Sequence, residues 1–256
     1  MTRYFVETGQ VARLTLDTVR AVFRRPFPVD AVAQQMFRLG ARSLPLVALT
    51  TIFTGAVMAV QTAYSLGRYG VQVYVGAFVG LSMVKELGPV LTAVMLAARV
   101  GAGITAEIGA MTVGEQVDAM RALGADPVKV LVLPRLLALL LMIPALTMLG
   151  ITLGILGGMY VSVTELDQVP GYYWSKVIEV MSVGDVLSGL GKSFFFAYFI
   201  GIIACHQGLT AHGGASGVGQ STTRSVVGSS ISIFIVNFFL SKASLYLQTH
   251  FGRIFW

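Results

Sequence analysis

Charged residues are scarce in this chain: only 12% of its 256 residues are charged, whereas 55% are hydrophobic. A typical soluble domain has about 25% charged residues and a smaller apolar share. The shortage of charge excludes an ordinary soluble protein and predicts an all-α, polytopic membrane protein. The length leaves room for about five or six membrane helices at roughly 20 residues each. We therefore expect a single domain over residues 1–256 and no separate soluble domain.

Cysteine is also nearly absent. The one cysteine, Cys205, lies in an apolar run, which excludes an internal disulfide and a cysteine metal site. His206, His212 and His250 lie far apart in the sequence and lack the spacing of metal ligands. No pairing of a nucleophile with a base can be argued from the sequence, so we expect neither a metal site nor catalysis in this chain.

A complete nucleotide-binding loop is missing as well. The segment SGLGKS, residues 188–193, resembles the end of such a loop, but the pattern requires a glycine where Val186 stands, and the apolar run FFFAYFIGII follows. The glycines of HGGASGVGQSTTR, residues 212–224, have no preceding strand and predict a flexible cytoplasmic turn between two spans. We expect no cofactor here, so any ATP, with its Mg²⁺, would be bound and hydrolysed by a partner chain.

The formal charge of +6 comes from basic residues that cluster beside apolar runs. The anionic inner leaflet of a membrane is therefore the expected counter-charge, rather than nucleic acid. Seven arginines, from Arg3 to Arg42, precede the first long apolar run, and only Arg68 follows it closely. This bias predicts a cytoplasmic N-terminus. We find no early apolar core of a cleavable signal peptide, so the first span is expected to act as the insertion signal.

Residues 1–42 are predicted to form an interfacial amphipathic region. Between residues 10 and 25, charged side chains recur at spacings of three and four and so share one helical face. These are Arg13, Asp17, Arg20 and Arg24. Such a helix would lie on the membrane surface, end at Pro26 and Pro28, and be followed by a second amphipathic piece at residues 30–42. An ordinary polar N-terminal extension is the alternative.

Five runs with little or no charge are predicted to cross the membrane in a bundle over residues 43–248. They cover residues 43–67, 84–111, 136–163, 193–211 and 225–247. Residues 69–84 are short for a crossing and predict a partial helix at the outer surface that leads into the second span. Residues 165–185 predict a long external connection that is more acidic than basic. Five crossings would place the C-terminus outside.

A short polar, amphipathic helix at about residues 113–124 is predicted between the second and third spans. Gly124 and Pro127 would end it. A membrane helix that runs directly into a compact polar helix, followed by another long apolar span, suggests a lever that transmits force rather than a pocket for covalent chemistry.

Three charged residues lie within or at the ends of the predicted spans. Lys85 and Glu86 lie toward the outer end of the second span, and Lys192 lies at the outer end of the fourth, so all three should have similar depth. A charge inside a bilayer is costly unless it is paired or hydrated. We hypothesise that Glu86 and Lys192 face a shared internal cavity as an ion pair. The alternative is that both side chains reach the external interface.

Small residues recur in the second span between Ala97 and Ala110. Small side chains let membrane helices approach closely. They would allow either packing within the chain or a homodimer contact, and their spacing does not decide between the two.

The stretch ELGPVLTAVMLAARVGAGITAEIGAMTVGEQVDAMRALGADP, residues 86–127, resembles the signature region of the Mla-type (MlaE/YrbE) permeases of lipid-transporting ABC systems. The pieces ELGP, AARVGAG, TAEIGAM and EQ-DAMRALG-DP occur together and in order. The resemblance extends from about Leu44 onward and includes TTRSVVGSS at residues 222–230. It implies a homodimeric permease of the bacterial inner membrane that docks a cytoplasmic ABC ATPase, works with a periplasmic MCE-domain protein and moves phospholipid between the inner and outer membranes.

Carried over position by position, the resemblance assigns ATPase coupling to the short polar helix. The residues are Glu115, Gln116, Asp118, Ala119, Met120, Arg121, Leu123 and Gly124. It also favours four polar sites in or near the lipid path: Lys85, Glu86, Lys192 and Arg224.

A phospholipid path also needs an apolar wall for the acyl chains. Candidates lie around the outer end of the first span and the partial helix that follows, with ordinary packing as the alternative role. They are Tyr64, Leu66, Val73, Tyr74, Phe78 and Leu81. Composition alone would equally fit a secondary carrier or a non-transporting membrane scaffold for an MCE-type complex. The coupling helix is the feature that separates an ABC permease from these alternatives.

Overall fold

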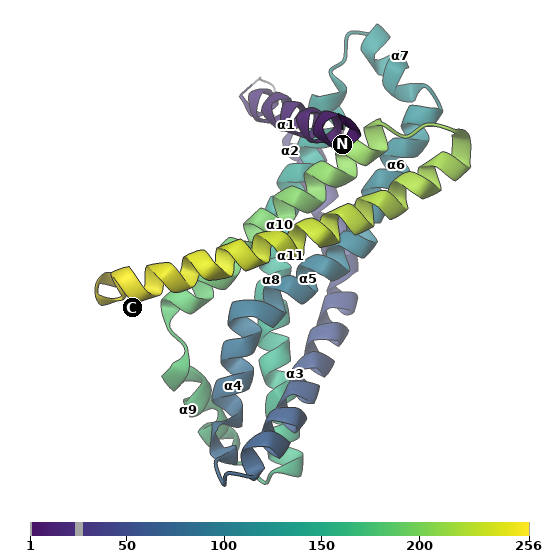
Figure 1. Ribbon diagram of the computed structural model, residues 1–256. Helices are drawn as coiled ribbons and strands as arrows, with labels where there is room; N and C mark the ends of the chain where they lie inside the picture. Colours follow the sequence, from purple (N-terminus) through teal and green to yellow (C-terminus); the bar gives the residue numbers. More distant parts are fainter. Residues whose placement is uncertain (1, 24–27, 256) are drawn as a thin grey trace. The chain divides into compact units, whose positions relative to one another are not determined.

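The computed structural model describes residues 2–23 and 28–255, and the side chains of residues 9–23 and 28–250. Helices joined by short turns make up this part of the chain, with no strand in it, which confirms the all-α prediction (Figure 1). Arg24 and Pro26, to which a charged face and a helix end were assigned, lie outside the described residues.

Five helical segments in the described residues are long and apolar enough to cross a membrane, as predicted. Several consist of more than one element because short π-helical or 3₁₀ turns interrupt the α-helix without ending the segment. The segments are Val29–Gly67, Gln72–Val113, Val128–Glu165, Val183–Leu209 and Gly214–His250. Their number and order match the five predicted spans, so the chain is a multi-pass membrane protein.

The first segment contains α2 (Val29–Gln35), the π turn η1 (Met36–Gly40), the 3₁₀ turn η2 (Ala41–Ser43) and α3 (Leu44–Gly67). The start of α3 agrees with the predicted first span to within one residue. This agreement is expected because the uncharged run is a local property of the sequence.

The predicted partial helix at residues 69–84 is present from Gln72 onward and leads into the second span, but no break separates the two. After the 3₁₀ turn η3 (Gln72–Tyr74), one continuous helical segment includes α4 (Val75–Ser82), the π turn η4 (Met83–Leu87), α5 (Gly88–Leu96), the π turn η5 (Ala97–Gly101) and α6 (Ala102–Val113). Helical hydrogen bonding continues through both π turns, so neither turn ends the helical segment.

Two further sequence predictions are corrected in the second half of the chain. The glycine-rich stretch 212–224 is largely helical, because α11 (Gly214–Phe255) begins at Gly214. Glycine and serine are tolerated in membrane helices, where no water competes for the backbone hydrogen bonds. The external connection also contains a helix, α9 (Pro170–Val180), and the fourth span, α10 (Val183–Leu209), begins ahead of the predicted residue 193.

The chain forms two compact units, each assembled from three separate stretches. The first unit consists of Met1–Ser43, Leu96–Met142 and Phe196–Ile233. In it, Gly201 of α10 contacts Leu136 of α8 (Leu133–Glu165), and the Thr105 hydroxyl of α6 donates a hydrogen bond to the Ala204 carbonyl of α10, 3.1 Å away. These contacts join α6, α8 and α10.

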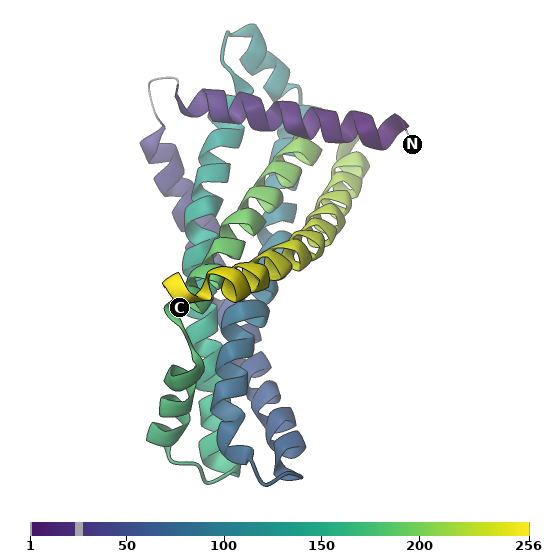
Figure 2. The ribbon, with the colours of Figure 1, turned by 60° about the vertical axis from the view of Figure 1, so that its left-hand side comes forward.

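Helix α1 (Thr2–Val22) belongs to the same unit and lies across the nearby ends of α8 and α10 (Figure 2). Leu14, Thr18 and Ala21 are buried, and the Thr15 and Tyr198 hydroxyls lie 2.6 Å apart. This helix therefore packs on the protein along one side. Its exposed apolar residues, including Leu16 and Val19, lie on another side, where they fit the predicted membrane-surface position.

The second unit consists of Leu44–Met95, Ile143–Phe195 and Phe234–Trp256. Its core joins α3, α4, α8 and α9, with Ala59, Val79, Ile155 and Tyr173 among the buried residues. A Cβ on Gly55 would collide with the Gly154 carbonyl, so glycine lets α3 and α8 touch backbone to backbone.

Candidate functional site

A polar network in the second unit surrounds Lys192 of α10. The ammonium group donates to the Glu86 carboxylate at 2.7 Å, to the Lys85 carbonyl oxygen at 2.8 Å and to the Ser241 hydroxyl at 2.8 Å. An ammonium group has three N–H donors, so these contacts use all of them. The Lys192 side chain is only 4% exposed. The predicted ion pair between Glu86 and Lys192 is confirmed.

The π turn η4 explains how one lysine reaches both a carboxylate and a backbone carbonyl. A π turn widens the helix and leaves a carbonyl without its usual partner, and such turns are frequent at functional sites. Here the carbonyl of Lys85 accepts from Lys192. Glu86 gains two more donors from α11, the amide of Asn237 at 2.8 Å and the hydroxyl of Ser241 at 2.7 Å. The network thus ties together η4, α10 and α11.

A second ion pair also joins η4 to α10, but here the cation belongs to η4 and the carboxylate to α10. Lys85 of η4 lies 2.8 Å from the Asp185 carboxylate, which is 6% exposed. Asp185 also exchanges hydrogen bonds with Ser182 at the start of α10, a capping box that fixes this helix end. The Gln248 amide of α11 donates to Asp185 at 2.8 Å. Sequence reasoning missed Asp185 because it placed this residue in the external connection.

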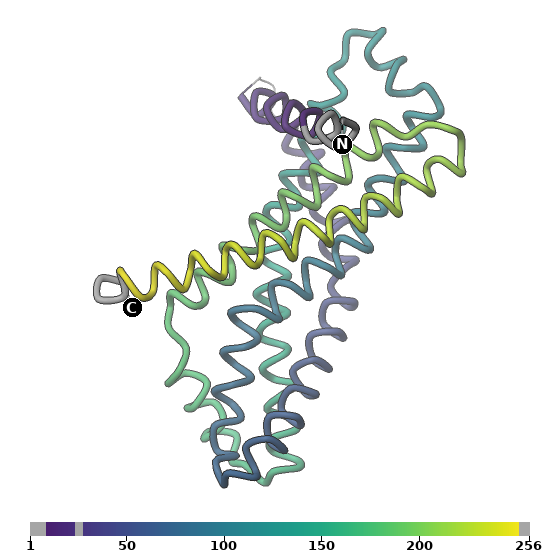
Figure 3. Tube along the Cα trace, viewed as in Figure 1, coloured from purple at the N-terminus to yellow at the C-terminus, as the bar shows by residue number. Residues whose placement is uncertain are grey.

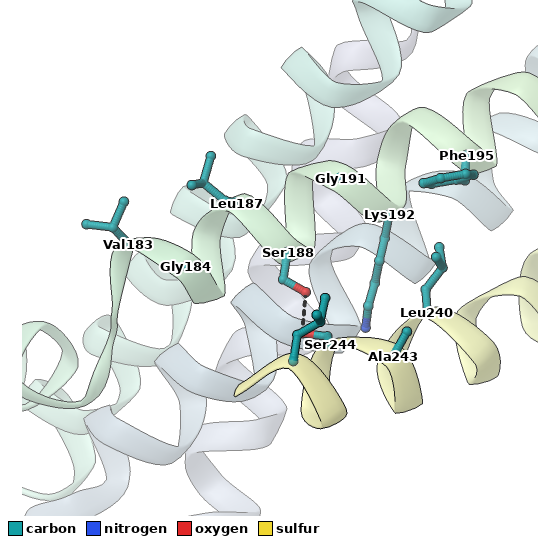
Figure 4. Close-up of a pocket in the computed structure, with 11 residues that line it drawn as sticks. Val183, Gly184, Leu187, Ser188, Gly191, Lys192, Phe195, Leu240, Ala243 and Ser244 are labelled. Carbon is teal, nitrogen blue, oxygen red and sulfur yellow. Dashed lines mark hydrogen bonds between the residues drawn. The ribbon is translucent and has the colours of Figure 1, made fainter. Parts of the chain in front are cut away.

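A cavity of ≈ 620 Å³ lies between α10 and the C-terminal part of α11, beside Lys192 (Figure 4). Its wall is mainly apolar, with Leu187, Phe195 and Leu240 among the lining side chains. The Ser188 hydroxyl donates to the Ser244 hydroxyl at 2.8 Å across it. Its size is in the usual range for ligand pockets, roughly 300–1,000 Å³. Lys192 lines this cavity but Glu86 does not, so the prediction that both residues face one cavity is not met here.

The predicted acyl-chain wall lies elsewhere in the second unit. Its six residues are not among those that line this cavity. Tyr64, Val73, Tyr74 and Phe78 are exposed, and Leu66 and Leu81 are partly buried. Arg224 belongs to the first unit and is exposed. A lipid contact at these seven positions stays a prediction.

The short polar helix between the second and third spans is present as α7 (Gln116–Ala122), and Figure 3 traces it between α6 and the π turn η6 (Val128–Val132). It starts later than predicted because α6 runs to Val113 and the chain then turns at Glu115, whose φ is 59°. Gly124, with φ of 78°, ends the helix in the left-handed conformation that glycine adopts without strain.

Helix α7 is exposed apart from one anchor. Val117 is 2% exposed, whereas Leu123 is 86% exposed. Asp118 and Arg121 form an exposed pair at 2.8 Å. The other residues assigned to coupling are exposed, except Met120, which is partly buried. The helix thus leaves most of these side chains on the surface of the chain.

A charged cluster in the first unit was not predicted. Glu107 of α6 lies 2.6 Å from Arg38 of η1 and 2.9 Å from Arg135 of α8. Arg135 is buried and also donates to the Leu131 carbonyl at 2.8 Å. Nearby in the same unit, Arg99 donates to the Arg42 carbonyl. The available signal was Glu107 itself, a lone carboxylate within an apolar helix.

Comparison with known proteins connects this architecture to a family. The model of the family described as "Permease MlaE" matches residues 32–243. The chain belongs to the MlaE permease family. This MlaE-family chain is 39% identical over 240 residues to a probable ABC transporter permease protein of Rickettsia felis, which covers 94% of this chain and 93% of the relative. It is therefore a permease subunit of an ABC transporter.

Two further relatives of this MlaE-family permease each cover about four fifths of the chain. A probable ABC transporter permease protein of Synechocystis is 43% identical over 208 residues, covering 81% of this chain and 79% of the relative. The chloroplastic protein TRIGALACTOSYLDIACYLGLYCEROL 1 of Arabidopsis thaliana is 37% identical over 213 residues, covering 82% of this chain and 60% of the relative.

Proposed function

We propose that this permease moves phospholipid between the inner and outer membranes of a bacterium and is driven by a separate ABC ATPase that docks on α7. The observation that carries the docking proposal is the construction of α7. One buried side chain, Val117, anchors the helix, and left-handed residues bound it at Glu115 and Gly124. A short helix held at both ends moves with the helices it joins, so a push on it would be transmitted to α6 and α8.

The exposed Leu123 supplies the kind of contact such docking needs. An apolar side chain that is 86% exposed at the end of a polar helix suits a pocket on a partner. The pair of Asp118 and Arg121 beside it would form a polar rim. ATP and Mg²⁺ would be bound by the partner, and this chain would carry no catalysis of its own.

The lipid part of the proposal rests on the cavity and on one relative. An apolar wall with a few polar groups at one side fits an amphipathic molecule. The Arabidopsis relative is named for a galactosyl diacylglycerol, which is a membrane lipid. Lys85, Glu86, Lys192 and Arg224 remain our proposed polar sites. Because Lys192 uses all three donors within the protein, a headgroup would have to displace one of these contacts to bind it.

We further propose the surroundings that the family resemblance implies. The permease would act as a homodimer in the inner membrane, with its N-terminus in the cytoplasm and its C-terminus in the periplasm. A periplasmic MCE-domain protein would accept or deliver the phospholipid. The positive charge that precedes the first span supports the orientation.

Co-purification with the ATPase tests the docking proposal. Leu123→Asp should abolish recovery of the ATPase with the tagged permease, because it places a charge in the proposed contact. Ser175→Lys, an exposed change on α9, is the matched control and should leave recovery unchanged. Full recovery of the ATPase with Leu123→Asp would exclude α7 as the docking element.

Lipid transfer is tested with the reconstituted complex. Vesicles that carry fluorescent phospholipid should lose it to acceptor vesicles only when ATP and the ATPase are present. Transfer at the same rate without ATP would point to a carrier, and its absence in a complex that hydrolyses ATP would contradict phospholipid as the cargo.

A further inference from the structure

Helix α9 in the second unit has one side packed firmly on the protein. Tyr173 and Val177 are buried and lie against Gly76 and Gly80 of α4. The Tyr173 hydroxyl donates to the Ile155 carbonyl at 3.3 Å. Burial raises the pKa of Tyr173, so the hydroxyl stays neutral. These contacts fix which side of α9 faces the protein.

A cation on the same helix fixes its rotation further. The Lys176 ammonium lies 5.4 Å from the Tyr74 ring centre and 5.6 Å from that of Tyr172. It also pairs with Glu179 at 2.6 Å, and this hydrogen bond raises the pKa of Lys176. The lysine therefore remains charged and links α9 to η3 through its contact with Tyr74.

The exposed side of α9 has an apolar stripe and a polar stripe, and the exposed Tyr172 lies on the polar one, three residues before Ser175. Trp174 and Ile178 are 41% and 60% exposed and lie four residues apart. Ser175 and Glu179 are also exposed and also lie four residues apart. Residues four apart share a helix face, and each step along the chain turns the helix by about 100°. The two stripes therefore lie side by side on the helix and point in directions about 100° apart.

The covalent connection holds α9 close to a membrane-spanning helix. Only Met181 and Ser182 separate it from α10. The three steps from Val180 to Val183, at about 3.5 Å each, span at most roughly 10 Å. Val183 and Leu187, at the start of α10, are 77% and 64% exposed and line the cavity beside Lys192. Helix α9 is therefore held beside the start of a membrane-spanning helix.

We propose that α9 lies in the interfacial layer of the bilayer, with Trp174 and Ile178 against lipid and Ser175 and Glu179 toward water. Tryptophan is enriched at this depth because its ring is apolar and its N–H is polar. A protein partner fits less well, because two side chains bury about 400 Å² at most, whereas a stable interface needs about 800 Å² from each side. This proposal depends on neither the cargo nor the ATPase.

The position of α9 has a consequence for the polar network. Helix α9 packs on α4, and α4 leads directly into the π turn with Lys85 and Glu86. Anchoring α9 at the interface would therefore set the depth of these charges in the bilayer.

Tryptophan fluorescence tests the proposal in the full-length chain. The sequence has two tryptophans, Trp174 and Trp256, so a Trp256→Phe variant reports on Trp174 alone. In vesicles of phosphatidylcholine and phosphatidylglycerol, lipids brominated near the headgroup should reduce its emission by about twofold, as expected for an interfacial indole. Lipids brominated at the chain ends should quench it less, and iodide in the water should have little effect.

Two added substitutions serve as test and control. Ile178→Asp should lower the quenching by brominated lipid and raise the quenching by iodide, whereas Ser175→Asp should change neither. If Ile178→Asp does not fold, Ile178→Ser takes its place. Strong iodide quenching without lipid quenching in the Trp256→Phe protein would place Trp174 in water. Protection from both quenchers would show that protein, such as a second copy, covers it. Either result would overturn the proposal.

Discussion

Two carboxylates on the same continuous helical segment, Glu86 and Glu107, are held in different ways. Glu86 lies in a π turn and receives one ammonium group together with neutral donors from Asn237 and Ser241. Glu107 lies in regular α-helix and receives two guanidinium groups. The first network joins three helices beside a cavity, whereas the second joins the N-terminal region to α6 and α8.

In both networks the buried member is the cation rather than the carboxylate. The side chain of Lys192 is 4% exposed and that of Arg135 is 7% exposed, against 44% for Glu86 and 33% for Glu107. Removing a carboxylate from a buried cation should therefore cost more than removing an exposed partner. The two networks also suit different roles. The Glu86 network lies beside a cavity and can change its partners during transport. The doubly paired Glu107 is suited to holding helices together.

The largest effect is expected for Glu86→Ala. It leaves the buried Lys192 ammonium without a counter-charge and should lower the free energy of unfolding by about 3 kcal/mol. Denaturant titration in detergent micelles measures this. Glu86→Gln keeps the shape and a hydrogen-bond acceptor, so it should cost less. Equal stability of Glu86→Ala and the unchanged protein would show that the ion pair contributes nothing.

Arg135→Met should come next, with a loss of about 2 kcal/mol, because Glu107 keeps Arg38 as a partner and is partly hydrated. The same titration applies. Arg20→Met removes an exposed arginine that lies 3.9 Å from the Asp17 carboxylate, and is the control. A loss no greater than that of the control would contradict a structural role for the cluster.

Arg38→Ala should cost only about 0.5 kcal/mol, because its side chain is 56% exposed and exposed pairs contribute little. The effect should shrink further at 1 M salt, where charges are screened. Measuring Arg38→Ala and Arg135→Met at two salt concentrations sharpens the comparison. If both arginines gave the same loss, burial would not be what distinguishes them.

The smallest effect on stability is expected for Asp118→Ala in α7. Both members of its pair are more than half exposed, so the free energy of unfolding should change by less than about 0.5 kcal/mol. A large loss of stability would mean that α7 is held by this pair rather than by Val117. Thr164→Ala, an exposed change at the end of α8, provides the reference.

The sequence predicted what depends on local composition. The start of α3 was placed to within one residue. Helix α7 was found because a short, polar, amphipathic stretch between two apolar spans is too polar to belong to either span. The pairing of Glu86 with Lys192 was predicted because a charge within an apolar run needs a partner, and few opposite charges were available at similar depth. The family was also recognisable from residues 86–127.

Other features were out of reach for the same local reasoning. Residues 212–224 were read as a loop from their glycines, but backbone groups within a membrane must be satisfied internally, which favours helix. Helix α9 was missed because its residues lie between charged positions that were read as an external connection, and its buried side forms only through tertiary contacts with α4 and α8.

The amino-acid sequence alone thus determined the membrane class, the five spans and the presence of a polar helix between two of them, because hydrophobicity and charge act residue by residue. The sequence also indicated that Glu86 pairs with Lys192, but only the tertiary structure decided the partners of the other charges. Lys85 pairs with Asp185 and Glu107 with two arginines, since partner choice depends on which helices pack together and on how a π turn rotates the side chains that follow it.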